Sequence, residues 1–404
     1  MVSSISHLSC SKCEKTFSHE KAINLCQCGG PLLVRYDLEK AKQVFTKELL
    51  NQKSTHSWNM WRYKALLPVI KEDNIVSLGE GCTPLIKTDN LSRKLSIDLF
   101  IKDEGLNPTG TFKARGASAG VSKAKELGIR TIAMPTAGNA GGAWSAYGRK
   151  AGIELIVAMP KDATELAKKE CFITGASTFL IKGLLSDAGN IIAKGTKKYN
   201  WFEVATLKEP YRIEGKKTMG FEIAEQFNWE MPDVIIYPTG GGVGIIGIWK
   251  AVKELEALGL LTGKRPRLVS VQAEGCRPIV DAFEQGKNHA EFYENAKTVI
   301  GGLRAPKVLG DALVLEAIRE SGGTALAISD EEILLGMKEL ARTEGMFICP
   351  EGAAAITATY KLLDSGYIKP KETVCILNTG SGLKYAELVD LELPTLEKDG
   401  EINI

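Results

Sequence analysis

The chain has 404 residues, of which 44% are hydrophobic and 25% are charged, as in an ordinary globular protein with two or three folded units. Its formal net charge of +2 gives no broad basic field, so we expect neither nucleic acid nor a membrane surface as a partner. No apolar run reaches the roughly 18 residues of a membrane-spanning helix. Nine cysteines in a chain of this length do not make a disulfide framework, and we expect a reduced, cytoplasmic setting.

The first 37 residues carry a pattern typical of a small zinc-ribbon-like head. A C-x2-C pair is followed, after twelve residues, by a C-x-C pair and two glycines, which places four thiols together: Cys10, Cys13, Cys26 and Cys28. Four thiolates suit a closed, structural zinc site. His7 and His19 are possible substitutes for a cysteine ligand. The alternative is a small apolar hairpin with free thiols.

Residues 38–104 are expected to form an arm and the first part of a large lobe. We predict one helix over Asp37–Gln52, with Leu38, Ala41, Val44, Phe45 and Leu49 on one face. An aromatic stretch from Trp58 to Tyr63 is expected to pack the arm on the main body. The loop 77–85 (Ser-Leu-Gly-Glu-Gly-Cys-Thr-Pro-Leu) leads into a strand, and a second strand is predicted over Asp98–Asp103.

Short apolar runs recur every ~24 residues from Thr131 onward, with segments of helical length between them. The strands are predicted over Thr131–Met134, Leu155–Met159, Thr178–Ile181 and Trp201–Ala205. Strands that alternate with helices favour parallel βαβ units. We therefore expect a small α/β lobe over residues 105–206.

A second, larger α/β lobe is expected over residues 207–404. Its predicted helices cover Lys216–Phe227, Ile245–Leu258, Glu331–Arg342 and Glu351–Leu363. Its predicted strands cover Asp233–Tyr237, Leu268–Gln272 and Thr373–Leu377. The tail after Leu391 has no such pattern and is expected at the surface.

Lys113 is the first candidate for chemistry. Asn107-Pro108 and Gly110 end a regular element, and Thr109 or Thr111 can cap the helix that follows. Lys113 then falls in the first helical turn, where the partial positive charge of the helix start disfavours an ammonium. An amine with a lowered pKa can form a Schiff base with an aldehyde cofactor. The alternative is a solvated lysine at a helix start.

The segment 233–244 is an apolar strand that runs into a glycine loop and then a helix. Free amides at such a loop and helix start favour a phosphate. Gly242, Gly244 and Gly247 also match G-x-G-x-x-G, a dinucleotide fingerprint for which Glu274 is a candidate ribose ligand. That acidic residue lies further on than the usual ~20 positions. No Gly-Lys-Ser/Thr follows, so the pattern is not a P-loop.

Two further loops follow predicted strands. Residues 135–142 (Pro-Thr-Ala-Gly-Asn-Ala-Gly-Gly) open a helix whose free amides suit a carboxylate, and Asn139 can donate to a phenolate-like oxygen. Residues 377–384 (Leu-Asn-Thr-Gly-Ser-Gly-Leu-Lys) place the Thr379 hydroxyl at the carboxyl edge of a sheet. The alternatives are ordinary helix capping for the first loop and a strand-ending turn for the second.

These segments occur in the order of a known family. Residues 107–113 (Asn-Pro-Thr-Gly-Thr-Phe-Lys) resemble the lysine motif of the pyridoxal-phosphate enzymes of fold type II, the tryptophan synthase β-like family. Within that family, the loop 77–85 and the segment 379–384 are similar to those of the threonine synthases. Ser381 stands where their motif has histidine, and Ala114 where many of them have aspartate. The head also resembles that of some bacterial and archaeal members.

The resemblance implies the fold: two α/β lobes with twisted, parallel-type sheets flanked by helices. It implies pyridoxal 5'-phosphate as the cofactor, held by Lys113 as a Schiff base, with its phosphate at the glycine loop, its ring oxygen at Asn139 and its ring nitrogen at Thr379. Val243 replaces a glycine of many members. The implied cofactor contacts are Phe112, Lys113, Asn139, Thr239, Gly240, Gly241, Gly242, Val243, Gly244 and Thr379. The implied substrate contacts are Thr136, Ala137, Gly138, Arg115 and Lys216.

The implied activity is that of a threonine synthase, a lyase that converts O-phosphohomoserine and water to threonine and phosphate. A phosphorylated amino acid needs a second anion site, for which Arg115, Lys216, Lys217 and Lys384 are the candidate cations. We also expect a homodimer. The alternatives with the same cofactor are cysteate synthase-like replacement and threonine or serine dehydration. The alternatives without it are a nicotinamide-dependent oxidoreductase and a metal-binding module.

Overall fold

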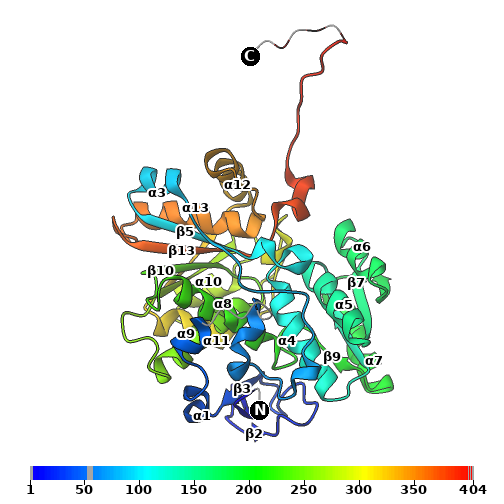
Figure 1. Ribbon diagram of the computed structural model, residues 1–404. Coiled ribbons are helices and arrows are strands. Elements are labelled where there is room, and N and C mark those ends of the chain that lie inside the picture. The colour runs from blue at the N-terminus through cyan, green and yellow to red at the C-terminus, as the bar shows by residue number, and fades with distance from the viewer. Residues whose placement is uncertain (1–2, 52–57, 399, 401, 403–404) are drawn as a thin grey trace.

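The computed structural model describes residues 3–51, 58–398, 400 and 402. Within these residues the strands form three sheets (Figure 1). No helix among them is long and apolar enough to cross a membrane.

The largest sheet has six strands in the order β12-β11-β10-β13-β5-β4. They are β4 (Leu85–Lys87), β5 (Asp98–Asp103), β10 (Val234–Pro238), β11 (Arg267–Ala273), β12 (Thr324–Ile328) and β13 (Thr373–Asn378). Neighbouring strands run parallel, except that β4 runs antiparallel to β5. Alternate residues face opposite sides: Ile235 and Tyr237 join one apolar core, and Val234 and Ile236 join the other.

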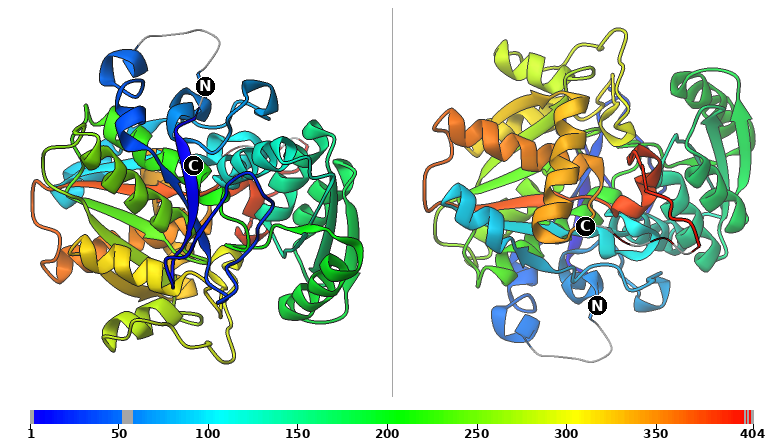
Figure 2. Two further views of the ribbon diagram at one scale, coloured as in Figure 1. Left: turned by 90° about the horizontal axis from the view of Figure 1, so that it is seen from below. Right: turned by 90° about the horizontal axis from the view of Figure 1, so that it is seen from above.

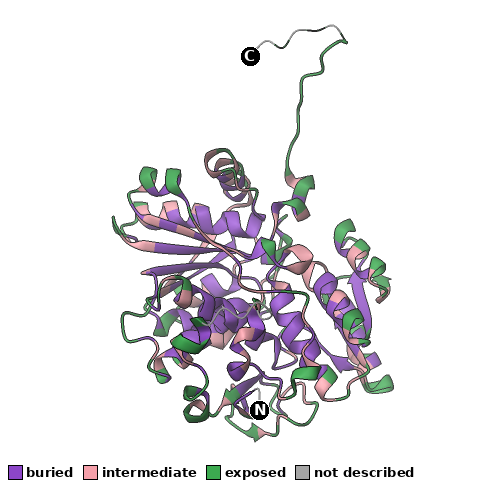
Figure 3. Ribbon diagram, in the orientation of Figure 1, coloured by how far each residue is buried: buried purple, intermediate pink, exposed green. Residues whose placement is uncertain are grey.

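Helices cover both faces of this sheet, as parallel strands require. The core of one face includes residues of α8 (Arg212–Gln226), α9 (Val243–Ala257), α10 (Pro278–Glu284) and α11 (Asp311–Glu320). The core of the other face includes residues of α3 (Asp89–Leu95), α12 (Asp330–Glu344) and α13 (Pro350–Asp364). Figure 3 shows the central strands buried between these layers.

The second sheet has four parallel strands in the order β8-β7-β6-β9 and lies at one side of the molecule (Figure 2). They are β6 (Thr131–Pro135), β7 (Glu154–Pro160), β8 (Ser177–Ile181) and β9 (Phe202–Glu203). Apolar residues of α4 (Lys113–Glu126) and α5 (Asn139–Ala151) pack on one face, and those of α7 (Leu185–Tyr199) on the other. The helix α6 (Glu165–Ile173) contacts α5 and β8.

The head is an antiparallel sheet in the order β2-β1-β3, formed by β1 (Ile5–Cys10), β2 (Thr16–Phe17) and β3 (Leu32–Tyr36). Short 3-10 helices connect the larger elements: η1 (Met60–Leu66), η2 (Glu72–Asn74), η3 (Glu104–Leu106), η4 (Pro108–Gly110), η5 (Gly301–Leu303) and η6 (Gly382–Leu388). The head's apolar core contains Tyr211, the residue that precedes α8. The head is therefore packed on the large lobe.

The prediction of one helix over Asp37–Gln52 was wrong. The structure has two short helices, α1 (Leu38–Lys42) and α2 (Lys47–Asn51), and Gln52 lies outside the described residues. Thr46 caps the start of α2, because its carbonyl accepts from the amide of Leu50 and its hydroxyl accepts from that of Leu49. The break leaves Val44 55% exposed.

The α/β fold class is confirmed, and most predicted elements lie within a few residues of those observed. The strand predicted over Trp201–Ala205 shortens to β9, and the helix predicted from Lys216 begins four residues earlier, at Arg212. The strand β12 and the helix α11 had not been predicted. The boundaries of the units stay predictions.

Candidate active site

A cavity lies where the carboxyl ends of the six-stranded and the four-stranded sheets face each other. Its lining comes from loops that follow β6, β10 and β13 and from the start of α4 and α8. The residues that line it include Phe112, Lys113, Asn139, Ala140, Trp144, Arg212, Lys216, Gly240, Gly241, Gly242, Val243, Glu351, Thr379 and Tyr385. The structure thus brings most of the predicted cofactor contacts into one cavity.

Lys113 is the first residue of α4, as predicted. The Thr111 hydroxyl accepts from its backbone amide at 3.3 Å. Burial lowers the pKa of the Lys113 amine to about 8, with a further contribution from the charge of Arg212. The amine lies 4.3 Å from the centre of the Phe112 ring. Among the described residues, none accepts a hydrogen bond from it, so a partly buried amine is left to react in the cavity.

The glycine loop forms the opposite wall. Gly242 caps α9 with φ of +78°, a conformation that favours glycine. A Cβ on Gly240 would overlap the carbonyl oxygen of Gly302. The amides of residues 240–243 donate to no other described residue, and they lie at a helix start. Thr239 and Gly244 flank the loop and do not line the cavity.

Asn139 begins α5 and projects from the small lobe into the cavity. Its side-chain nitrogen donates to the Tyr385 hydroxyl at 2.8 Å. Thr136, Ala137 and Gly138 form the turn before it, and they lie beside the cavity rather than among its lining residues.

Thr379 follows β13 and lines the cavity. Its carbonyl oxygen accepts from the amide of Phe112 at 3.0 Å. The amide of Ser381 in turn donates to the carbonyl of Gly110 at 2.9 Å. These bonds hold the lysine loop against the end of the large sheet.

The structure does not bring Arg115 to the cavity, contrary to our prediction. Its guanidinium is fully buried and donates to Glu104 and Glu222 at 2.6 and 2.7 Å, and to the hydroxyls of Thr218 and Thr83. A guanidinium with every donor group engaged has no capacity left for a substrate. We therefore remove Arg115 from the substrate contacts.

Of the other candidate cations, Lys216 lines the cavity, whereas Lys217 and Lys384 do not. Lys216 lines the cavity, and its amine lies 4.0 Å from the centre of the Phe112 ring and donates to the Phe112 carbonyl. Burial, followed by the charge of Lys113, lowers the pKa of Lys216. Lys217 is bound to Glu214 and Glu254 instead, and Lys384 to Glu170.

The sequence analysis did not identify the cavity residues Arg212, Glu351 and Tyr385. Arg212 lies one helical turn before Lys216 on α8. The predicted helix began only at Lys216; an earlier start would have placed the two residues on one face, because they are four positions apart. The Arg212 guanidinium donates to Glu209 at 2.5 Å and lies 4.9 Å from the Trp144 ring. Glu351 and Tyr385 had no comparable signal.

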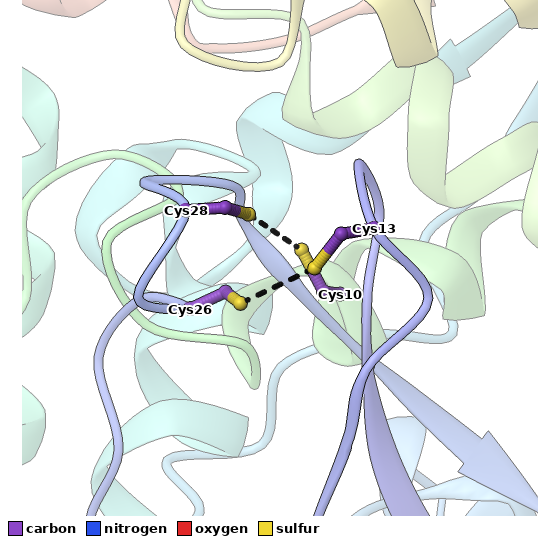
Figure 4. A group of neighbouring side chains, drawn as sticks. All are labelled: Cys10, Cys13, Cys26 and Cys28. Carbon is purple, nitrogen blue, oxygen red and sulfur yellow. Dashed lines mark hydrogen bonds between the residues drawn. The ribbon is translucent and has the colours of Figure 1, made fainter.

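The four cysteines of the head come together as predicted (Figure 4). Their sulfur atoms all lie within 4.8 Å of one another, with Cys10 and Cys28 at 3.4 Å and Cys13 and Cys26 at 3.5 Å. Zn–S bonds of about 2.3 Å in a tetrahedron put sulfurs about 3.8 Å apart. The cluster fits zinc, and neither His7 nor His19 belongs to it.

The cavity also fits pyridoxal phosphate. Free amides at the start of α9 suit its phosphate, and the Lys113 amine, whose pKa is lowered, suits its aldehyde. The Thr379 hydroxyl and the Asn139 amide are uncharged polar groups that suit the polar atoms of its ring. The glycines of the loop add no side chain to their part of the wall, which leaves the backbone amides open to a phosphate.

Comparison with known proteins agrees with this chemistry. Residues 76–380 match the family model "Pyridoxal-phosphate dependent enzyme". A threonine synthase of Methanocaldococcus jannaschii is 38% identical over 377 residues, which cover 93% of this chain and 92% of the relative. A threonine synthase of Methanosarcina acetivorans is 39% identical over 386 residues, which cover 95% and 93%.

Solved structures share the fold at lower identity. A processed threonine deaminase from Solanum lycopersicum has a TM-score of 0.65 and 18% identity, covering 76% of this chain and 82% of its own. Maize serine racemase also has a TM-score of 0.65, with 20% identity and coverage of 76% and 89%. The nicotinamide alternative is excluded by the family match. The chain belongs to the pyridoxal-phosphate dependent enzymes and, within them, to the threonine synthase family.

Proposed function

We propose that the protein is a threonine synthase that converts O-phosphohomoserine and water to threonine and inorganic phosphate, a lyase-type elimination and replacement. The observation that supports this proposal is a pair of basic side chains in the cavity, Arg212 and Lys216. Arg212 and Lys216 lie one turn apart on α8, are both buried and both line the cavity. They belong to α8, whereas the glycine loop precedes α9, so the proposal gives each of the two phosphates its own contacts.

The charges support this assignment. Lys113, Lys216 and Arg212 gather three basic groups around the cavity, and Glu351 is the acidic residue of its described lining. Beside burial, the charge of Arg212 lowers the pKa of Lys113, and the charges of Lys113 and Arg212 lower the pKa of Lys216. An incoming phosphate would relieve that repulsion, and it would favour the charged form of Lys216.

Pyridoxal phosphate, when bound, supplies an aldehyde for the substrate amine and a ring that withdraws electrons from Cα. Lys113 Nζ is placed to take the Cα proton and return a proton to the substrate carbon chain, since its lowered pKa keeps part of the amine neutral near pH 7. Residues 240–243 hold the cofactor phosphate by their amides. Arg212 and Lys216 hold the substrate phosphate until it leaves Cγ.

The remaining contacts orient the reactants. With the cofactor bound, Asn139 would donate to its ring oxygen, and the Thr379 hydroxyl would be an uncharged partner for its ring nitrogen. The turn 136–138 offers its amides to the substrate carboxylate.

Ala114 is compatible with O-phosphohomoserine as the substrate. Its side chain is fully buried and packs in the apolar core of the small lobe. It does not line the cavity, so the aspartate of many relatives is replaced at a packing position.

A substrate panel tests the proposal. We expect the holoenzyme to release phosphate and threonine from O-phosphohomoserine, and to favour it over O-phosphoserine, free threonine and free serine. Phosphate release is measured together with chromatography of the amino-acid product. Turnover of O-phosphoserine or free threonine without that of O-phosphohomoserine would replace this function by cysteate synthesis or dehydration.

Arg212→Gln tests the second anion site. We expect KM for O-phosphohomoserine to rise about a hundredfold, as for loss of a buried charge partner, with the spectrum of bound cofactor unchanged. Arg149→Gln, at an exposed position of α5, is the matched control and should keep the wild-type KM. Equal KM values for the two variants would remove Arg212 from the substrate site.

We also propose that Cys10, Cys13, Cys26 and Cys28 hold one structural zinc, supported by the packing of their sulfurs. A homodimer and a cytoplasmic location stay proposals. Light scattering of the purified protein and cell fractionation are their tests.

A further inference from the structure

The 3-10 helix η6 (Gly382–Leu388) lies between the two lobes, as the red turn beside the green small lobe in the right view of Figure 2. Two successive side chains of η6 reach the small lobe. Lys384 Nζ pairs with Glu170 of α6, and the hydroxyl of Tyr385 meets Asn139 of α5. Tyr385 is 9% exposed and lines the cavity.

Tyr385 is the middle of a hydrogen-bonded chain that crosses the cavity. The Tyr385 hydroxyl donates to Glu351 Oε1 at 3.0 Å, and the amide of Gly302 donates to the same oxygen at 2.9 Å. Asn139 Nδ2 donates to the Tyr385 oxygen at 2.8 Å. Glu351 belongs to α13 of the large lobe, so the chain joins one lobe to the other.

The direction of each bond follows from the groups themselves. A carboxylate only accepts, so the single phenol proton goes to Glu351. Burial raises the pKa of Tyr385, as does the charge of Glu351, so this proton is retained at neutral pH. The phenol oxygen can then only accept, which fixes the side-chain nitrogen of Asn139 toward it.

This arrangement leaves one polar hydrogen unused. The side-chain nitrogen of Asn139 carries two hydrogens, and Tyr385 takes one of them. The other is free for a ligand in the cavity, because the described residues provide no further acceptor for it. Asn139 stands at the first position of α5, where the backbone alone does not set the rotation of its amide.

We propose that Tyr385, held by Glu351, is a positioning residue that aims the second N–H of Asn139 at the ring oxygen of the cofactor. The inference rests on the role given to Asn139 under the proposed function. It adds that η6, a 3-10 helix that follows β13, orients the Asn139 side-chain amide for that contact.

The test is the absorption of the bound cofactor as a function of pH. A hydrogen bond to the ring oxygen stabilises its charged form, so its loss moves the pH midpoint of the spectral change upward. Tyr385→Phe should move it in the same direction as Asn139→Ala and weaken cofactor binding about fivefold, as for one lost hydrogen bond. The double variant should show no larger shift than Asn139→Ala alone, because Tyr385 acts through Asn139.

Tyr360→Phe is the matched control, since it removes a phenol that also binds a glutamate, Glu339, but lies outside the cavity. It should leave the midpoint unchanged, and melting of each apoprotein verifies that the variants fold. The inference is overturned if Asn139→Ala shifts the pH midpoint of the spectral change and Tyr385→Phe does not. It is also overturned if the two shifts add in the double variant. If Asn139→Ala leaves the pH midpoint unchanged, Asn139 does not contact the ring oxygen of the cofactor, and the positioning role of Tyr385 falls with that assignment.

Discussion

At the scale of single residues, the chemistry of the cavity rests on an amine that burial has made less basic. Lys113 is held at a helix start, and burial, followed by the charge of Arg212, disfavours its ammonium form. The charge of Glu351 opposes them in part. The environment that lowers the pKa of the Lys113 amine also lowers the stability of the folded apoprotein, because the charged amine is disfavoured there.

This cost predicts a pH dependence. The folded pKa of about 8 lies below the ordinary 10.5, so the cost is complete below pH 8 and disappears as pH rises toward 10.5. Apoprotein carrying Lys113→Met should therefore be more stable than wild type at pH 7, by up to about 3 kcal/mol. Urea unfolding at pH 7 and pH 10 measures this gain, which should shrink at the higher pH. A gain that is the same at both pH values would contradict the lowered pKa.

At the scale of elements, a buried ion network joins α4, α8 and η3. Arg115 of α4 binds Glu104 of η3 and Glu222 of α8, and Lys102 of β5 also binds Glu222. These charges are out of contact with water. Their role is to fix the helix that begins with Lys113.

Arg115→Met leaves Glu104 buried without its partner. We expect it to lower the free energy of unfolding by about 3–5 kcal/mol, with KM for the substrate unchanged in the folded fraction. Denaturant unfolding and steady-state kinetics measure the two effects, with the exposed Arg149→Met as control. A raised KM at unchanged stability would return Arg115 to the substrate site.

The head is the second element with a testable role. It packs around Tyr211, and the Asn24 side chain donates to the carbonyls of Glu203 and Lys208 at 2.6 and 2.7 Å, so it supports the loop before α8. We expect about one zinc per chain, lost in Cys13→Ser, with a lower melting temperature and the cofactor retained. Cys82→Ser, outside the cluster, should keep the metal. Metal analysis that finds no zinc in protein purified under reducing conditions would reject the site.

Sequence reasoning succeeded where a short local pattern determines structure. Strand periodicity, the glycine loop and the first turn at Lys113 are local, and all three were predicted. Arg115 was misplaced because its partners, Glu104 and Glu222, are set by the packing of α4 on α8. Glu351 and Tyr385 were missed because they reach the cavity only through tertiary contacts.

At the scale of the whole molecule, the site exists because two sheets present their carboxyl ends to one cavity. The small lobe brings Lys113 and Asn139, and the large lobe brings the glycine loop, Thr379 and α8. Backbone bonds between the lysine loop and the end of β13, with the contacts of η6, hold the lobes together. The amines of Lys113, which is partly buried, and of Lys216, which is buried, both lie against the Phe112 ring.

The most direct test of the account is to determine which of these two amines binds the cofactor. Borohydride reduction of the holoenzyme fixes the cofactor to its lysine, and mass spectrometry of the peptides locates it. We predict the adduct on Lys113, with Lys113→Ala lacking both the adduct and threonine formation while Lys216→Met keeps the adduct. An adduct on Lys216, or full activity in Lys113→Ala, would contradict the account.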